Sequence, residues 1–116
     1  MTACPIQAAV EAMGGKWKPG ILSRLQGGRL RLSEMRRRMP WISERVLIRQ
    51  VQELVAAGLV DRRDHGTMPP RTDYGLTPHG ETLRPLLAEM GRWGEAHLAR
   101  TAEAMRHGAS ATMFPP

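Results

Sequence analysis

The chain of 116 residues is poor in the features that mark several common classes of protein. It has one cysteine, Cys4, which excludes an internal disulfide and a cysteine-rich zinc site. Aromatic residues make up 4% of it, and no apolar run reaches the roughly 18–20 residues that a membrane-spanning helix needs. The N-terminus lacks the charged and apolar regions of a signal peptide. We therefore expect a cytoplasmic, reduced protein of one modest domain, with no membrane partner.

Groups that would support metal binding or catalysis are also scarce. The histidines are His65, His79, His97 and His107. They are widely separated and share no ligand spacing, so we expect no metal site and no cofactor. A thiol peroxidase would use Cys4 as its nucleophile, but no pattern supplies a base, an orienting third group or a phosphate-cradling loop. The sequence therefore argues against an enzyme.

Arginine is the residue that the chain has in excess. Fifteen of its seventeen basic residues are arginine, set against eleven acids, and the net charge is +6. Ten of these arginines and five acids lie between residues 29 and 71, so this stretch holds nearly all of the surplus charge. The planar guanidinium pairs bidentately with phosphate or with guanine. A localised basic stripe of this kind indicates a polyanionic partner.

The segment 43–57, SERVLIRQVQELVAA, carries a clear helical pattern. At 100° per residue its two sides differ in polarity. The side expected to be buried carries Leu47, Val51, Leu54 and Val55, and the opposite side carries Arg45, Arg49, Gln52 and Ala56. Ser43 is a good N-cap, and Gly58 suits the left-handed residue that ends a helix. The segment therefore predicts a helix with one apolar face and one basic face.

A shorter helix, residues 33–39 with Ser33 as its cap, precedes this one after a tight turn. Two helices in this arrangement, the second with a basic outer face, are typical of a motif that reads the DNA major groove. Two short strands, 59–63 and 72–76, follow around a turn-forming segment that contains a Pro-Pro pair. A β-hairpin after a helix-turn-helix predicts a winged helix.

Two further helices are predicted before this motif. Pro5 opens a short helix over 6–13, which places Cys4 at the N-cap. The positive end of the helix dipole stabilises a thiolate at that position. A second helix covers 16–26, and the alternating residues 29–32 suggest one short strand.

Residues 78–106 predict a long helix that is kinked at Pro85. Its apolar stripe must pack across its own domain or meet a second copy of the chain. The expected fold is mainly α with a small β-hairpin wing, a single winged helix-turn-helix domain over residues 1–106. Residues 107–116 are small, polar or proline-rich and predict a disordered tail.

Candidate DNA contacts lie on the basic helix face, on the shorter helix before it and beside the wing. They are Arg36, Arg37, Arg38, Ser43, Arg45, Arg49, Gln52, Arg62, Arg63 and Arg71. Arginines of a wing commonly reach phosphates or a narrow minor groove. The alternative is that these charges are merely solvated, in a winged helix that makes protein contacts without specific DNA binding.

With these segments placed, the chain resembles the HxlR-type family of bacterial and archaeal winged helix-turn-helix regulators. The resemblance spans roughly residues 4–94 and is carried by three blocks: CPIQAAVEAMGGKWKPGIL, ISERVLIRQVQELVAAGLVDRR, and PPRTDYGLTPHGETLRPLL with MGRWG. The chain departs from the family pattern at Trp41, where glycine is usual, and at Ile48, where a small hydroxyl residue is common. Trp41 either packs beneath the turn or points toward DNA.

The resemblance implies a transcriptional regulator that binds double-stranded DNA at an inverted-repeat operator as a homodimer, with 43–57 as the recognition helix. It also implies that the terminal helices, about 6–13 and 78–106, form the dimer. The residues expected in that interface are Ile6, Val10, Leu83, Leu87, Met90, Trp93 and His97. Some family members sense oxidants, quinones or aldehydes through the cysteine that aligns with Cys4. Cys4 is therefore either a redox or electrophile switch or a packing residue, and a small-molecule effector stays open.

Overall fold

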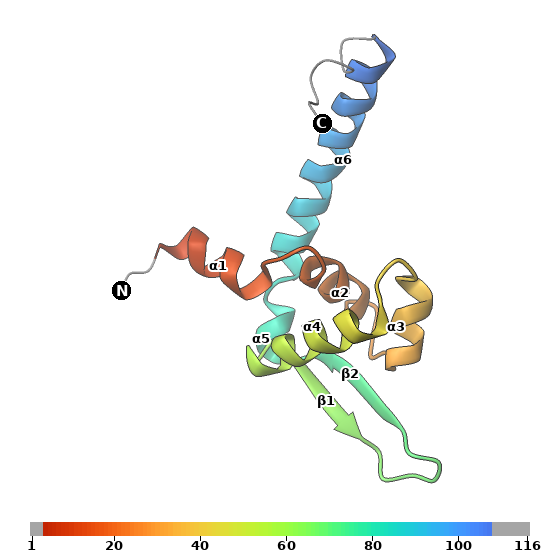
Figure 1. The fold of residues 1–116 in the computed structure, drawn as a ribbon. Helices are drawn as coiled ribbons and strands as arrows, with labels where there is room; N and C mark the ends of the chain where they lie inside the picture. The colour runs from red at the N-terminus through yellow and green to blue at the C-terminus, as the bar shows by residue number, and fades with distance from the viewer. Residues whose placement is uncertain (1–3, 108–116) are drawn as a thin grey trace. The chain divides into compact units, whose positions relative to one another are not determined.

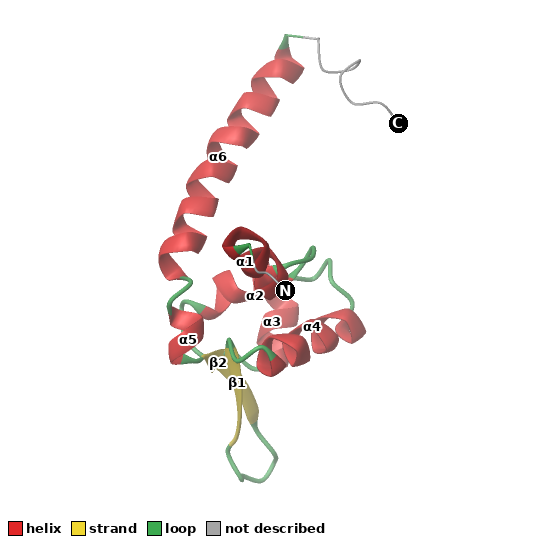
Figure 2. Cartoon of the chain, turned by 90° about the vertical axis from the view of Figure 1, so that its left-hand side faces the viewer, coloured by secondary structure: helices red, strands yellow, loops and turns green. Residues whose placement is uncertain are grey.

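The computed structural model describes residues 4–107 and divides into two compact units, with the boundary between Arg84 and Pro85. The first unit contains α1 (Pro5–Met13), α2 (Lys18–Leu25), α3 (Leu32–Arg38), α4 (Glu44–Ala56), β1 (Val60–Asp64), β2 (Thr72–Leu76) and α5 (Pro78–Glu81). The second consists mostly of α6 (Arg84–Arg106). Figures 1 and 2 show the helices and the hairpin. The predicted fold class is confirmed, whereas the extent of the domain stays a prediction. The predicted tail lies, apart from His107, outside the described residues.

The core of the first unit lies where α2, α3 and α4 meet. Its most deeply buried side chains are Ile21, Leu22, Leu25, Met35, Met39, Leu47, Val51, Leu54 and Val60. Burying one such side chain contributes roughly 1.5–3 kcal/mol. An ion pair of 2.7 Å between Lys18 Nζ and Glu53 Oε1 also joins α2 to α4. Because α4 gives one face to this core, its opposite face stays at the surface.

The predicted ends of α4 are confirmed. The Ser43 hydroxyl oxygen accepts the Val46 backbone N–H at 3.2 Å. Gly58 adopts a φ of +79°, and the Leu59 N–H donates to the Leu54 carbonyl at 3.1 Å. The prediction that Val55 is buried is wrong, because its side chain is 37% exposed. It lies about 80° around the helix from Leu47, at the edge of the buried arc.

Helix α3 begins one residue earlier than predicted, and Ser33 is not its cap. The Glu34 carboxylate accepts the Arg31 backbone N–H at 2.8 Å, while Ser33 lies exposed inside the first turn. This early start also leaves little room for the predicted strand at 29–32. Only Leu30 pairs there, exchanging backbone hydrogen bonds of 2.9 and 2.8 Å with Tyr74.

The hairpin of β1 and β2 projects from the helical part of the first unit (Figure 1). It is antiparallel, with Arg62 opposite Tyr74 and Arg63 opposite Asp73. Successive side chains of a strand point to opposite faces. Arg62 therefore shares a face with the buried Val60, whereas Arg63 lies on the other face. The two neighbouring arginines do not form one cluster.

The N-terminal helices begin close to their predicted positions. Helix α1 starts at Pro5 with Cys4 as its N-cap, as predicted. It buries Met13 but leaves Ile6 and Val10 76% and 52% exposed. Helix α2 begins at Lys18, two residues later than predicted, and its N-cap Trp17 is only half-buried.

The single kinked helix predicted over 78–106 is wrong, because α5 ends at Glu81 and α6 begins at Arg84. Pro85 has no N–H to donate to the carbonyl of Glu81, and its ring would clash there in a continuous helix. The Thr82 hydroxyl instead donates to the His79 carbonyl at 2.5 Å. Pro85 then occupies the first turn of α6, where proline is tolerated.

The two candidate serine caps make a testable pair. We expect Ser43→Ala to lower the free energy of unfolding by about 1 kcal/mol, because the α4 N-terminus loses its side-chain acceptor. Ser33→Ala should change it far less, because Ser33 makes no capping bond. Urea denaturation of both variants measures the difference. Equal losses would contradict the capping that we describe.

Candidate nucleic-acid interface

The outer face of α4 presents polar side chains to solvent. Arg45, Arg49 and Gln52 are all exposed and lie opposite the buried Leu47, Val51 and Leu54. Neither arginine makes an ion pair within residues 4–107. Their guanidinium groups are therefore available to a phosphate or a base edge.

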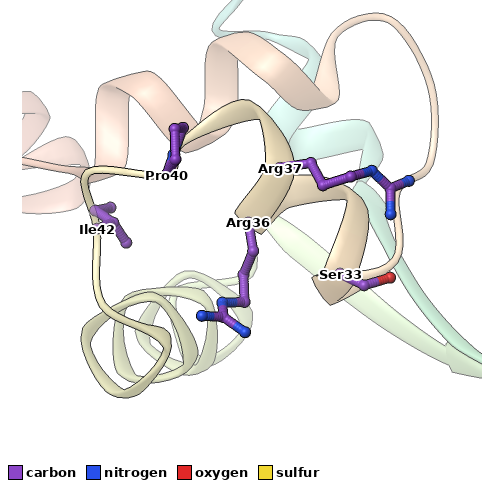
Figure 3. Close-up of a pocket in the computed structure, with 5 residues that line it drawn as sticks. All are labelled: Ser33, Arg36, Arg37, Pro40 and Ile42. Carbon is purple, nitrogen blue, oxygen red and sulfur yellow. The ribbon is translucent and has the colours of Figure 1, made fainter.

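Next to this face, α3 and the turn after it line an open hollow of about 400 Å³. Figure 3 shows its lining residues, Ser33, Arg36, Arg37, Pro40 and Ile42. Arg36 points toward α4 and lies 3.4 Å from the Glu44 carboxylate, whereas Arg37 points another way. Arg38 is also exposed. The α3 arginines thus differ: Glu44 partly neutralises Arg36, whereas Arg37 makes no ion pair within residues 4–107.

The wing arginines differ in the same way. Arg62 lies 3.2 Å from Asp64, in an exposed ion pair that contributes little. With Gln52, Val55 and Tyr74 it also lines a hollow of about 370 Å³ between α4 and the hairpin. Arg63 and Arg71 are exposed and make no ion pair in the described part of the chain.

Arg29, which the sequence placed in the basic stripe, instead makes internal contacts with the wing. Its Nε donates to Asp73 Oδ1 at 2.6 Å, and its Nη2 lies 2.7 Å from Asp61 Oδ1. Asp73 is 6% exposed, and its second oxygen lies 2.7 Å from His65 Nε2. The hydrogen bond from Arg29, with a smaller contribution from His65, holds the pKa of Asp73 below its ordinary value.

Sequence reasoning missed this cluster, although Gly75 gave a signal. A glycine inside a strand often marks the close approach of another group. A Cβ at Gly75 would lie 2.5 Å from Arg29 Nη1 and 2.9 Å from Arg29 Cγ. The absence of a side chain at this position admits the arginine.

Trp41 does not pack beneath the turn. It is 59% exposed, and the Arg24 guanidinium lies over its ring at 5.7 Å from the centroid. The neighbouring Ile42 fills the space beneath the turn and is 4% exposed. Of the two alternatives for Trp41, packing beneath the turn is therefore wrong, and an orientation toward DNA stays a prediction.

The residues predicted for a dimer interface lie in three places. Ile6 and Val10 are exposed on α1, and Leu83 is a half-buried residue of the link that joins α5 to α6 in the sequence. The others belong to α6, which buries none of its residues. They are the half-buried Leu87 and the exposed Met90, Trp93 and His97. Trp93 and His97 stack with ring centroids 4.9 Å apart.

Among residues 4–107, no three His, Cys, Asp or Glu side chains gather as metal ligands. No helix there combines the length and the apolar character needed to cross a bilayer. Cys4 is exposed at the start of α1.

A helix-turn-helix with an arginine-bearing second helix, followed by a β-hairpin with exposed arginines, defines the class of winged-helix DNA-binding proteins. A model of HxlR-like helix-turn-helix proteins matches residues 12–102. The chain belongs to this family. It is a transcriptional regulator and not an enzyme, as the sequence predicted.

Individual relatives agree with this assignment. The chain is 40% identical over 94 residues to an uncharacterized HTH-type transcriptional regulator of Methanothermobacter thermautotrophicus, covering 81% of this chain and 72% of that protein. It is 38% identical over 94 residues to the regulator YybR of Bacillus subtilis, covering 81% and 75%. The oxidized form of the redox regulator HypR has a TM-score of 0.77 and 39% identity, covering 80% of this chain and 96% of that chain.

The Asp73 contacts predict a pH-dependent stability. Because its pKa is lowered in the folded protein, Asp73 stabilises the fold fully above the ordinary carboxyl pKa of about 3.9. That contribution is lost as the pH falls through the lowered value. We expect Asp73→Asn to have a lower free energy of unfolding than wild type at neutral pH. This difference between the two proteins should disappear below about pH 4. Chemical denaturation across pH measures this difference, with Asp64→Asn as an exposed control. A difference that does not change with pH would contradict the assignment.

Proposed function

We propose that this regulator binds double-stranded DNA by placing the outer face of α4 in the major groove. The observation that carries the proposal is the set of exposed Arg45, Arg49 and Gln52 opposite a buried apolar face. Arginine pairs bidentately with guanine, and glutamine with adenine. An exposed face with these side chains therefore supplies sequence readout as well as affinity.

The arginines of α3 and the wing take the sequence-independent part of the binding. Arg37 and Arg38 are exposed beside the turn that leads into α4 and contact phosphates. Arg36 contributes less, because Glu44 already offsets part of its charge. Arg63 and Arg71 reach the backbone or the minor groove beside the wing, as wing arginines commonly do. Arg62 contacts DNA from the α4 side of the hairpin.

The regulator acts as a homodimer on an inverted repeat. Support comes from the apolar side chains that α1 and α6 leave exposed, among them Ile6, Trp93 and Leu98, which are 76%, 69% and 68% exposed. A second copy of the chain can cover such surfaces, because in a two-fold dimer the same patch of each copy forms the interface. Two linked half-site contacts also bind far more tightly than one.

Cys4 makes the regulator responsive to an oxidant or an electrophile. The thiol is exposed at the N-cap of α1, one of the proposed dimer helices. The similar protein HypR is named a redox regulator and is known in oxidized and reduced forms. With one cysteine per chain, two Cys4 thiols form an intersubunit disulfide by giving two electrons to the oxidant and releasing two protons. An electrophile instead forms a thioether adduct. A DNA partner and a reduced thiol both agree with a cytoplasmic location.

The first test separates base contacts from phosphate contacts on a duplex selected for tight binding. Arg49→Ala should weaken binding to that duplex by roughly 1–3 kcal/mol more than binding to a random duplex. Arg37→Ala should weaken both about equally and reduce the salt slope by about one. Arg106→Ala is the control for lost charge. If Arg49→Ala and Arg37→Ala both bind like the parent across a salt titration, the proposed face is wrong. That result would favour the alternative, a winged helix that makes protein contacts without specific DNA binding.

The second test concerns Cys4. Cys4→Ser should bind the selected duplex as the reduced parent does, because the side chain is not among the proposed DNA contacts. Treatment with a thiol oxidant should change the affinity of the parent and leave Cys4→Ser unchanged. A parent protein that binds DNA identically before and after complete thiol modification would make Cys4 a packing residue.

A further inference from the structure

Arg29 holds two acids that lie on one face of the wing. Asp61 belongs to β1 and Asp73 to β2, and Asp61 is paired in register with Gly75, two residues beyond Asp73. The guanidinium of Arg29 spans both strands, with contacts of 2.7 Å to Asp61 and 2.6 Å to Asp73. A planar guanidinium suits such a bridge, because its donors point in several fixed directions.

Arg29 has little capacity left for DNA. Its side chain is 26% exposed, and Nη2 also lies 3.4 Å from the Asp73 backbone carbonyl. The adjacent Leu30 exchanges two backbone hydrogen bonds with Tyr74, which holds the arginine beside the hairpin. An arginine that is available to bind a phosphate would not be occupied by internal contacts of this kind.

Arg63 lies on the same face and stands directly opposite Asp73 in the hairpin register. Opposite charges facing each other across an antiparallel pair normally attract. Yet Asp73 is occupied by Arg29 and His65, and Arg63 is exposed and makes no ion pair within residues 4–107. The acid nearest to Arg63 in the register is therefore already neutralised.

We propose that Arg29 is a positioning residue of the DNA interface, which occupies Asp61 and Asp73 and so leaves Arg63 free for the DNA backbone. The proposal rests on the DNA-binding function proposed above. Without Arg29, Asp61 loses its cation, Asp73 keeps only its contact with His65, and Arg63 turns to Asp73 across the strands. The wing then presents one fewer positive charge to DNA, although Arg29 itself touches no DNA.

The experiment compares Arg29→Ala, Arg29→Lys and Gly75→Ala in DNA-binding titrations on a selected duplex. We expect Arg29→Ala to weaken binding by about 5-fold or more, the low end of typical coupling between sites. Gly75→Ala keeps every charge but displaces the guanidinium, so it should weaken binding in the same direction. Arg29→Lys should also lose affinity, because one ammonium cannot replace the planar bridge. An Arg29 that contacts phosphate directly predicts instead that Gly75→Ala and Arg29→Lys bind almost normally, which would overturn the proposal.

A double-mutant cycle with Arg63 supplies a readout that a purely structural role would not move. When Arg29→Ala is added to Arg63→Ala, we expect almost no further loss of DNA affinity. The reason is that Arg63, the group that Arg29 leaves free for DNA, is already absent. Additive losses, or an Arg63→Ala variant with normal affinity, would overturn the proposal. Thermal unfolding of each variant confirms that it is folded at the temperature of the titration. If Arg29→Ala is not folded, the same cycle is run with Arg29→Lys.

Arg49→Ala separates this inference from the function on which it rests. If Arg49→Ala weakens binding and the Arg29 variants do not, the DNA-binding face stands and the role of Arg29 is wrong. If neither Arg49→Ala nor Arg29→Ala has an effect, the proposed face itself is wrong.

Discussion

The burial of one face of α4 is the constraint on which the rest of the first unit depends. Leu47, Val51 and Leu54 are at most 1% exposed, and they pack where α2 and α3 supply apolar side chains. Replacing one such leucine with alanine typically costs 2–5 kcal/mol, so rotation of α4 about its axis is strongly opposed. This packing turns Arg45 and Arg49 toward solvent, so their orientation does not depend on contacts of the arginines themselves.

The wing is held by a different kind of interaction. Its sheet has only two strands, and hairpins of this size are marginal alone. Leu30 adds one bridging pair, and Arg29 joins the two strands through their acids. The result divides the basic residues by role. Some arginines neutralise acids within the protein, whereas others, such as Arg63 and Arg71, keep their charge for a partner. A count of charges along the sequence cannot make this division.

Local patterns predicted much of the fold, because their causes are local. The apolar period of α4 apart from Val55, the Ser43 cap, Gly58 and the second strand each depend on neighbouring residues, and each is confirmed. The wrong or missing predictions have two other causes, which are competing local signals and contacts between residues far apart in the sequence. Glu34 competes with Ser33 for the start of α3, and Pro85 permits a break as readily as a kink. Arg29 and Asp73 are 44 residues apart, so only the folded chain brings them together.

Selection of tight-binding duplexes from a random pool is the most direct test of the central claim, that two copies of the α4 face read DNA. The account predicts an inverted repeat whose half-sites are centred about one helical turn, roughly 34 Å, apart. Arg49→Ala should alter the preferred bases within each half-site, and Arg106→Ala should not. A single unrepeated site would contradict the dimer, and a pool without any enriched sequence would contradict recognition by α4.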